Sequence, residues 1–162
     1  MNRPKEKKEQ LSLDSAVVHI LEECRMVLPG IQALFGFQLI AVFNEKFSQL
    51  LLRDQQLHFA AIFLTVIAIA LLMSPAAVHR QTDPYAVTSR FINVSTRLLL
   101  LGMFPMVISI CLDVYLIAHS ILQFDKLALL FSGTLLVIFC ILWIALPWWE
   151  KRRETAEGSL VH

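Results

Sequence analysis

Several patterns that would indicate chemistry are missing from this sequence. It contains no nucleophile elbow, no phosphate-binding glycine loop and no pair of carboxylates within one apolar stretch. Its three cysteines, Cys24, Cys111 and Cys140, are scattered, so neither a zinc site nor a disulfide is expected. The net charge of +1 gives no bulk attraction to nucleic acid. We therefore expect no enzymatic activity, no metal or other cofactor and no nucleic-acid partner.

Long polar segments are also scarce, because four apolar stretches occupy most of a chain that is 57% hydrophobic. The stretches cover roughly residues 27–43, 57–78, 98–118 and 127–149. A helix needs about 20 residues to cross a hydrocarbon layer about 30 Å thick. A soluble bundle would need helices with a polar face, yet Phe59–Met73 has Thr65 as its sole polar residue. We predict an all-α membrane protein, a bundle of four transmembrane helices over residues 27–150 with the lipid bilayer as its surroundings.

Basic residues are unevenly distributed among the connections. Eleven lie before the first stretch, in the second connection or after the fourth stretch: Arg3, Lys5, Lys7, Lys8, Arg25, Arg80, Arg90, Arg97, Lys151, Arg152 and Arg153. Three lie in the first and third connections: Lys46, Arg53 and Lys126. The positive-inside rule therefore predicts that both termini, including a tail over residues 151–162, are cytoplasmic. An even number of spans agrees with this topology.

The segment before the first span predicts two further parts. Residues 1–10 are charged and are expected to form a disordered cytoplasmic arm, without the apolar core or cleavage site of a signal peptide. Residues 11–28 place apolar side chains at helical spacing, which predicts an amphipathic helix. This helix could lie on the inner membrane surface or dock beneath the bundle, and its acidic residues favour docking. Pro29-Gly30 then predicts a kink or a break before the first span.

Two local signals bear on the ends of the later helices. Asp83 suits an N-cap and Pro84 suits the first helical position, so the third helix is predicted to begin near Pro84. Trp148 and Trp149 precede a basic cluster at the end of the fourth stretch. This combination is typical of an anchor at the membrane–water interface.

Asp113 is the one acidic residue expected well inside a span. Placing a charged side chain there costs about 2.5–3.5 kcal/mol on insertion scales, so an intramembrane acid is a candidate functional group. The functional interpretation makes Asp113 a proton or cation site with Gln32, Gln38 or Tyr115 as neighbours. The alternative is a structural carboxyl group, protonated or hydrogen-bonded across helices, that fixes their packing. The sequence leaves both interpretations open.

Two histidines and three arginines are weaker candidates. His58 and His119 are expected at the outer ends of the second and third spans, where two imidazoles could ligate a haem or a metal. Histidines that face water at the interface are the more common case. Arg80, Arg90 and Arg97 could contact lipid phosphate or acidic groups of a partner protein. Their role as topology determinants explains them equally well.

Five stretches resemble one known family. They are Glu22–Phe43 (EECRMVLPGIQALFGFQLIAVF), Ser74–Arg80 (SPAAVHR), Arg90–Gly102 (RFINVSTRLLLLG), Leu112–Val114 (LDV) and Ala145–Trp149 (ALPWW). Together they resemble a family of small bacterial four-span membrane proteins classed as a domain of unknown function. Some members carry the automatic label sodium:proton antiporter, although antiporter folds use many more spans. The resemblance implies location in the bacterial inner membrane and supplies no mechanism.

These observations lead to two hypotheses of different classes. The first is a non-enzymatic integral membrane protein that serves as an accessory or structural subunit of a membrane complex, or that associates with itself. Gly30, Ala33 and Gly36 recur at a three-residue step and would let another helix approach closely. The second is translocation of a proton or cation with Asp113 as the titrating group. Because four helices alone rarely enclose a pore, the second hypothesis requires an oligomer.

Overall fold

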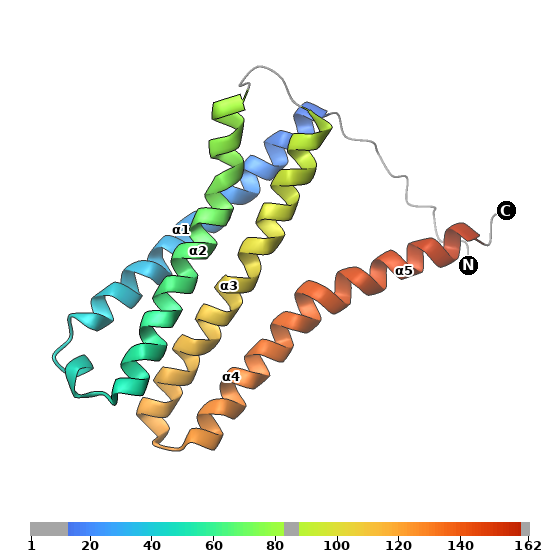
Figure 1. Cartoon of the computed structure of the whole chain (residues 1–162). Coiled ribbons are helices and arrows are strands. Elements are labelled where there is room, and N and C mark those ends of the chain that lie inside the picture. Colours follow the sequence, from blue (N-terminus) through green and yellow to red (C-terminus); the bar gives the residue numbers. More distant parts are fainter. Residues whose placement is uncertain (1–12, 83–87, 160–162) are drawn as a thin grey trace.

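The computed structural model describes residues 13–82 and 88–159, and within these ranges it contains helices and connections without strands (Figure 1). In chain order the elements are α1 (Leu13–Val42), the 3-10 turn η1 (Phe47–Gln49), α2 (Leu52–Thr82), α3 (Ser89–Leu122), α4 (Asp125–Cys140), the π-helical turn η2 (Ile141–Ala145) and α5 (Leu146–Ser159). Within the described ranges, four helical segments are long and apolar enough to cross a membrane: Ser15–Val42, Leu52–Gln81, Ser89–Leu122 and Asp125–Arg153. The predicted all-α fold with four membrane-length helices is confirmed.

The most extensive packing is between the antiparallel helices α2 and α3 (Figure 1). Ala61, Thr65, Ala68 and Leu72 are buried and recur every three or four residues, so they share one face of α2. Small side chains on such a face let two helix backbones approach closely, and close packing is a main source of helix association in lipid. Helix α1 packs against α2 and, less extensively, against α3. These three helices carry nearly all the buried residues of the described chain.

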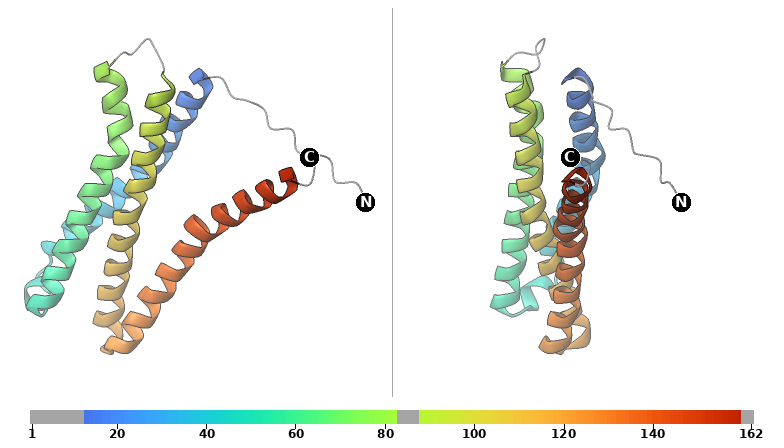
Figure 2. Two further views of the ribbon diagram at one scale, coloured as in Figure 1. Left: turned by 45° about the vertical axis from the view of Figure 1, so that its right-hand side comes forward. Right: turned by 90° about the vertical axis from the view of Figure 1, so that its right-hand side faces the viewer.

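Helix α4 contacts this group on one side only. Close to the turn after α3, Ala128 is fully buried and the Ser132 hydroxyl donates to the Cys111 carbonyl over 2.7 Å. Farther along, α4 leans away from α3 and continues through η2 into α5 (Figure 2). A π-helical turn such as η2 is a recognised cause of bending. Because Leu136 and Val137 are also exposed, most of the surface of α4 is left to lipid or to another chain.

The two ends of the bundle differ. The short-loop end holds the connection over residues 43–51 and the turn over residues 123–124, whereas the terminal end holds the start of α1, the end of α2 and the start of α3 (Figure 1). Gln123 ends α3 in the left-handed conformation with φ 55°. Its backbone N–H donates to the His119 carbonyl over 3.0 Å, which completes the helix end. The sequence predicts that the short-loop end faces the outside.

One predicted helix boundary differs from the structure, and another lies outside the described residues. Helix α1 continues through Pro29, so residues 11–28 and the first span do not form separate helices over the described part of the chain. Pro75 and Pro105 likewise lie inside α2 and α3. Membrane-spanning helices tolerate proline because neighbouring groups can pair with the backbone carbonyl that proline leaves free. Asp83 and Pro84 lie outside the described residues, and α3 begins at Ser89 after an extended Thr88.

The close approach of α2 and α3 depends on Gly102. A Cβ atom at this position would lie 3.0 Å from Leu72 Cγ and 3.3 Å from Leu71 Cβ. We expect Gly102→Val to overpack this contact and to lower the free energy of unfolding by about 1–3 kcal/mol. The measurement is the thermal unfolding midpoint in detergent. Gly133→Val is the matched control, since a Cβ at Gly133 on α4 meets nothing within 4 Å. An equal loss in both variants would show that helix propensity, not packing, sets the effect.

Candidate functional site

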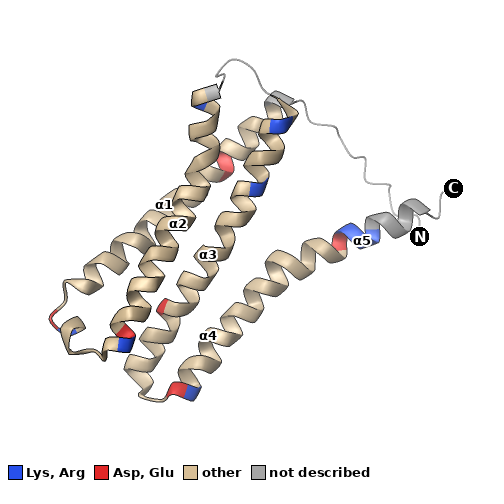
Figure 3. Cartoon of the chain, viewed as in Figure 1, with Lys and Arg blue, Asp and Glu red and all other residues tan. Residues whose placement is uncertain are grey.

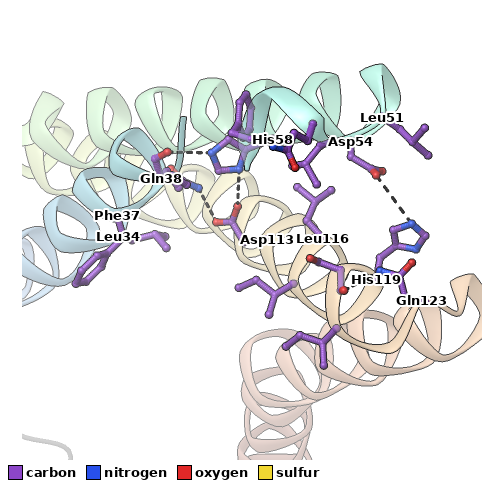
Figure 4. A pocket seen from close by; sticks show the side chains of 17 residues that line it. Leu34, Phe37, Gln38, Leu51, Asp54, His58, Asp113, Leu116, His119 and Gln123 are labelled. Atoms are coloured by element: carbon purple, nitrogen blue, oxygen red, sulfur yellow. Dashed lines mark hydrogen bonds and ion pairs between the residues drawn. The ribbon is translucent and has the colours of Figure 1, made fainter. Parts of the chain in front are cut away.

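A carboxyl group, an amide and an imidazole from three helices meet near the short-loop end. The Gln38 side chain on α1 donates from Nε2 to Asp113 Oδ2 on α3 over 2.6 Å. Asp113 Oδ1 lies 3.7 Å from Nδ1 of His58 on α2, and the side chains of His58 and Asp113 are only 11% and 15% exposed (Figure 4). The structure therefore places Gln38 beside Asp113 and adds His58 to the same site.

The network continues from Gln38 into the packed part of the bundle. Gln38 Nε2 also donates to the Ser109 hydroxyl over 2.9 Å. The hydroxyls of Ser109 and Thr65 lie 2.7 Å apart, and the Ala61 carbonyl is within 2.8 Å and 3.1 Å of them. Thr65 lies seven residues beyond His58 along α2, which places it about 10 Å deeper at 1.5 Å per residue. These hydrogen bonds connect α1, α2 and α3 through buried side chains.

The site near Asp113 is rich in acceptors and poor in donors. His58 Nε2 lies 2.9 Å from the Gln38 backbone carbonyl, and because a carbonyl only accepts, Nε2 must carry the hydrogen. A neutral His58 ring then presents Nδ1 as an acceptor toward Asp113 Oδ1. Gln38 Oε1 is buried and has no hydrogen-bond partner among the described residues. A proton or a ligand with N–H groups would supply the donors that this site lacks.

A second polar cluster joins α2, α3 and α4 at the same end. The Arg53 guanidinium donates to the Tyr115 hydroxyl over 3.0 Å, and this hydroxyl lies 3.5 Å from Asp125 Oδ1. His119 lies between two carboxylates, with Nδ1 2.9 Å from Asp125 and Nε2 3.9 Å from Asp54. The Tyr115 and His119 rings are stacked with centroids 6.0 Å apart. These contacts hold the α3–α4 turn against the start of α2.

A pocket of about 570 Å³ lies between α1, the connection after it, α2 and α3 at the short-loop end (Figure 4). Its polar lining includes Gln38, Asp54, His58, Asp113 and His119. Most of the remaining lining is apolar and comes from Leu34, Phe37, Ala41, Phe47, Leu50, Leu51, Leu116, Ile117 and Ile121. The pocket thus combines two carboxylates with a wide apolar wall, which is an amphipathic arrangement.

Four other predicted site residues have different surroundings. Gln32 is exposed on the outer side of α1, and Tyr115 belongs to the second cluster. His58 faces the Asp113 carboxylate and His119 lies between Asp54 and Asp125, so the two rings do not face a shared ligand position. In the described chain no group of three or more His, Cys, Asp or Glu side chains is arranged to hold a metal ion.

The three arginines lie far from the site, near the terminal end of the bundle. Arg80 is exposed in the last turn of α2, and Arg90 and Arg97 are exposed along the first part of α3 (Figure 3). This position is compatible with contact to lipid phosphate or to a partner, as well as with a role in topology.

Sequence reasoning missed Ser109 and the second cluster. Ser109 lies four residues before Asp113, so a helix places both on one face, and this spacing could have revealed it. Thr65 is the sole polar residue of Phe59–Met73, which is also a usable signal. Asp54 and Asp125 gave no such signal, because acidic residues are common near the predicted ends of membrane spans.

The chain belongs to a family described as "Family of unknown function (DUF6328)", whose model matches residues 5–147. This finding agrees with the predicted membership of a family of unknown function. No curated protein matches the sequence. No solved structure matches it either.

The two interpretations of Asp113 predict different responses to substitution. In Asp113→Asn the amide oxygen still accepts from Gln38 and the amide N–H can donate to His58 Nδ1. We therefore expect Asp113→Asn to keep the wild-type unfolding midpoint. Asp113→Leu leaves polar groups on two helices without a partner and should lower the free energy of unfolding by about 1–3 kcal/mol. Thermal unfolding in detergent measures both, and an Asp113→Leu variant as stable as Asp113→Asn would exclude a structural role.

Proposed function

We propose that this protein is a non-enzymatic integral membrane protein that works by assembly, with the outward face of α1 pairing with a second copy of the chain. The outward face is defined by Pro29, Gln32, Ala33 and Gly36. Association with itself is one of the two forms of assembly that the sequence suggests. The other form is association with different proteins, as a subunit of a larger membrane complex.

The outward face supports the proposal because small residues on it are left unused within the chain. A Cβ atom at Gly36 would meet nothing within 4 Å, and Ala33 is exposed. At 100° per residue, Ala33 lies on the side of α1 opposite Ile31, which is buried against the bundle. Small residues at such positions are enriched where two membrane helices pack closely.

Gln32 is the observation that carries the proposal. Its amide is exposed on the outward face, next to Gly36, and makes no hydrogen bond to another described residue. In hydrocarbon such an amide seeks a partner on a neighbouring helix, with a gain of about 0.6–2 kcal/mol per bond. A two-fold dimer with parallel α1 helices places Gln32 opposite Gln32 at the same depth. Each amide both donates and accepts, so the two can satisfy each other.

The second candidate function is translocation of a proton or cation through an oligomer at Asp113. It is favoured by the acceptor-rich site around Asp113 and His58. It receives less support from the region beyond Thr65, where Ala68, Leu72 and Val107 are buried apolar residues. A single chain thus places polar groups along only part of the depth of the membrane. Other copies of the chain would have to supply the rest of a path for an ion.

The location that we propose is the bacterial inner membrane with both termini and the α2–α3 connection in the cytoplasm. The distribution of Lys and Arg supports this orientation. In it the pocket opens near the outer surface, and Arg80, Arg90 and Arg97 lie near anionic headgroups of the inner leaflet.

Substitutions on the outward face test the assembly. We expect the wild-type chain to be dimeric in a gentle detergent, and Ala33→Ile to raise the dimer dissociation constant about tenfold or more, because the added side chain keeps the helices apart. Gln32→Leu should weaken the dimer through loss of the amide pair. Ala70→Ile is the matched control, since Ala70 is exposed on α2 away from this face. Light scattering after size exclusion measures the masses.

Three outcomes would contradict the proposal. A monomeric wild type, or dimers that resist both substitutions, would exclude the outward face as the interface. A stoichiometric second protein after purification from the native membrane would replace the dimer with a hetero-complex. Proton flux in liposomes that Asp113→Asn abolishes would favour translocation instead.

A further inference from the structure

The pocket at the short-loop end has the composition of a ligand site, and its argument is independent of assembly through α1. Gln38 lines the pocket, is only 3% exposed and keeps Oε1 buried without a partner among the described residues. Asp113 Oδ1 and His58 Nδ1, which also line it, lie 3.7 Å apart, and with a neutral His58 ring both are acceptors. A ligand that complements three such atoms carries several N–H donors.

The charge of the lining selects the sign of the ligand. Asp54 and Asp113 both contribute carboxylates, and no Lys or Arg is among the lining residues. His58 and His119 each lie within 4 Å of one of these carboxylates, so even protonated rings would only balance them. A cationic head group is therefore favoured over an anionic one.

The volume and the apolar walls of the pocket indicate what the remainder of the ligand is. Leu34, Phe37 and Ile117 form apolar wall, and Phe37 and Ile117 are 71% and 59% exposed toward the side of the bundle. A volume of about 570 Å³ lies within the range of about 300–1,000 Å³ that is typical of small-molecule sites. An alkyl chain can thus lie along the wall while its head group reaches Asp113.

We propose that this pocket binds a cationic amphiphile, an alkylammonium ion. The N–H groups of the head donate to the Asp113 carboxylate and to Gln38 Oε1, and the alkyl chain lies against Leu34, Phe37 and Ile117. The head group thereby pairs with Gln38 Oε1, which is buried and has no partner among the described residues.

The test is thermal unfolding of the full-length protein in lipid nanodiscs with increasing octylammonium chloride. We expect saturable stabilisation of the wild type. The affinity should fall about tenfold or more in Asp113→Asn, because the variant removes the negative charge of the acceptor and leaves the ammonium ion a hydrogen bond to a neutral amide oxygen. Octyltrimethylammonium has no N–H group and should bind more weakly, and octyl sulfate should not stabilise.

A second variant keeps the test decisive if Asp113→Asn folds poorly. Ala41→Trp fills the pocket from its wall without removing a hydrogen bond of the network, and it should abolish the octylammonium effect. Ala70→Trp, at an exposed alanine outside this pocket, is the control and should bind as the wild type does. Three results would overturn the site. Octylammonium could fail to stabilise the wild type, or it could stabilise the wild type, Asp113→Asn and Ala41→Trp equally. Stabilisation by octyl sulfate would be the third. Equal binding of the two ammonium ions would overturn the role of Gln38.

Discussion

The arrangement of the first three helices depends on the Gln38 amide. From α1 it donates to Ser109 and Asp113 on α3, while its backbone carbonyl accepts from His58 on α2. A bilayer core has no water to pair with such groups, so polar side chains that enter it must find one another. One glutamine thereby fixes the rotation of α1 about its own axis, because any other rotation would leave Asp113 and Ser109 without this donor. That rotation in turn decides which side of α1 faces outward.

Different interactions hold the different helix pairs together. Helices α2 and α3 approach closely over the small residues Ala61, Ala68 and Gly102, and Leu72 of α2 packs directly against Gly102. Helix α1 has less contact with this pair, and its polar bonds near the short-loop end leave room for the pocket beside them. Helix α4 packs against α3 on one side, is held near the turn by Ser132 and by the Asp125 cluster, and exposes most of its remaining surface. The chain is thus compact at its centre and open along α1 and α4, which suits a protein that functions among other membrane helices.

The same buried acceptors are open to two uses. A proton between His58 and Asp113 would satisfy them in an empty site, and an ammonium head would satisfy them in an occupied one. Both uses take place at one end of the bundle, because the hydrogen-bonded chain stops at Thr65 and apolar residues follow. A site of this kind favours binding over passage in a single chain. The residues around Asp113 lie on the side of α1 that packs against α2 and α3. A dimer through the outward face of α1 would therefore not cover them.

The sequence by itself determined the solvent and the fold class, because a run such as Phe59–Met73 can be satisfied only by lipid or by other helices, and hydropathy depends on composition alone. It also singled out Asp113, since one acid in an apolar span is costly wherever its neighbours lie. It did not determine which groups meet Asp113. Gln32 and Gln38 are equivalent in the sequence, and only the rotation of α1 in the folded chain buries one and exposes the other. Pro29 likewise predicted a kink or a break, but a proline removes only one backbone hydrogen bond, and α1 continues through it as one helix. The pocket and the pairing of His58 with Asp113 arise from three segments far apart in the chain, so only the tertiary structure could bring them together.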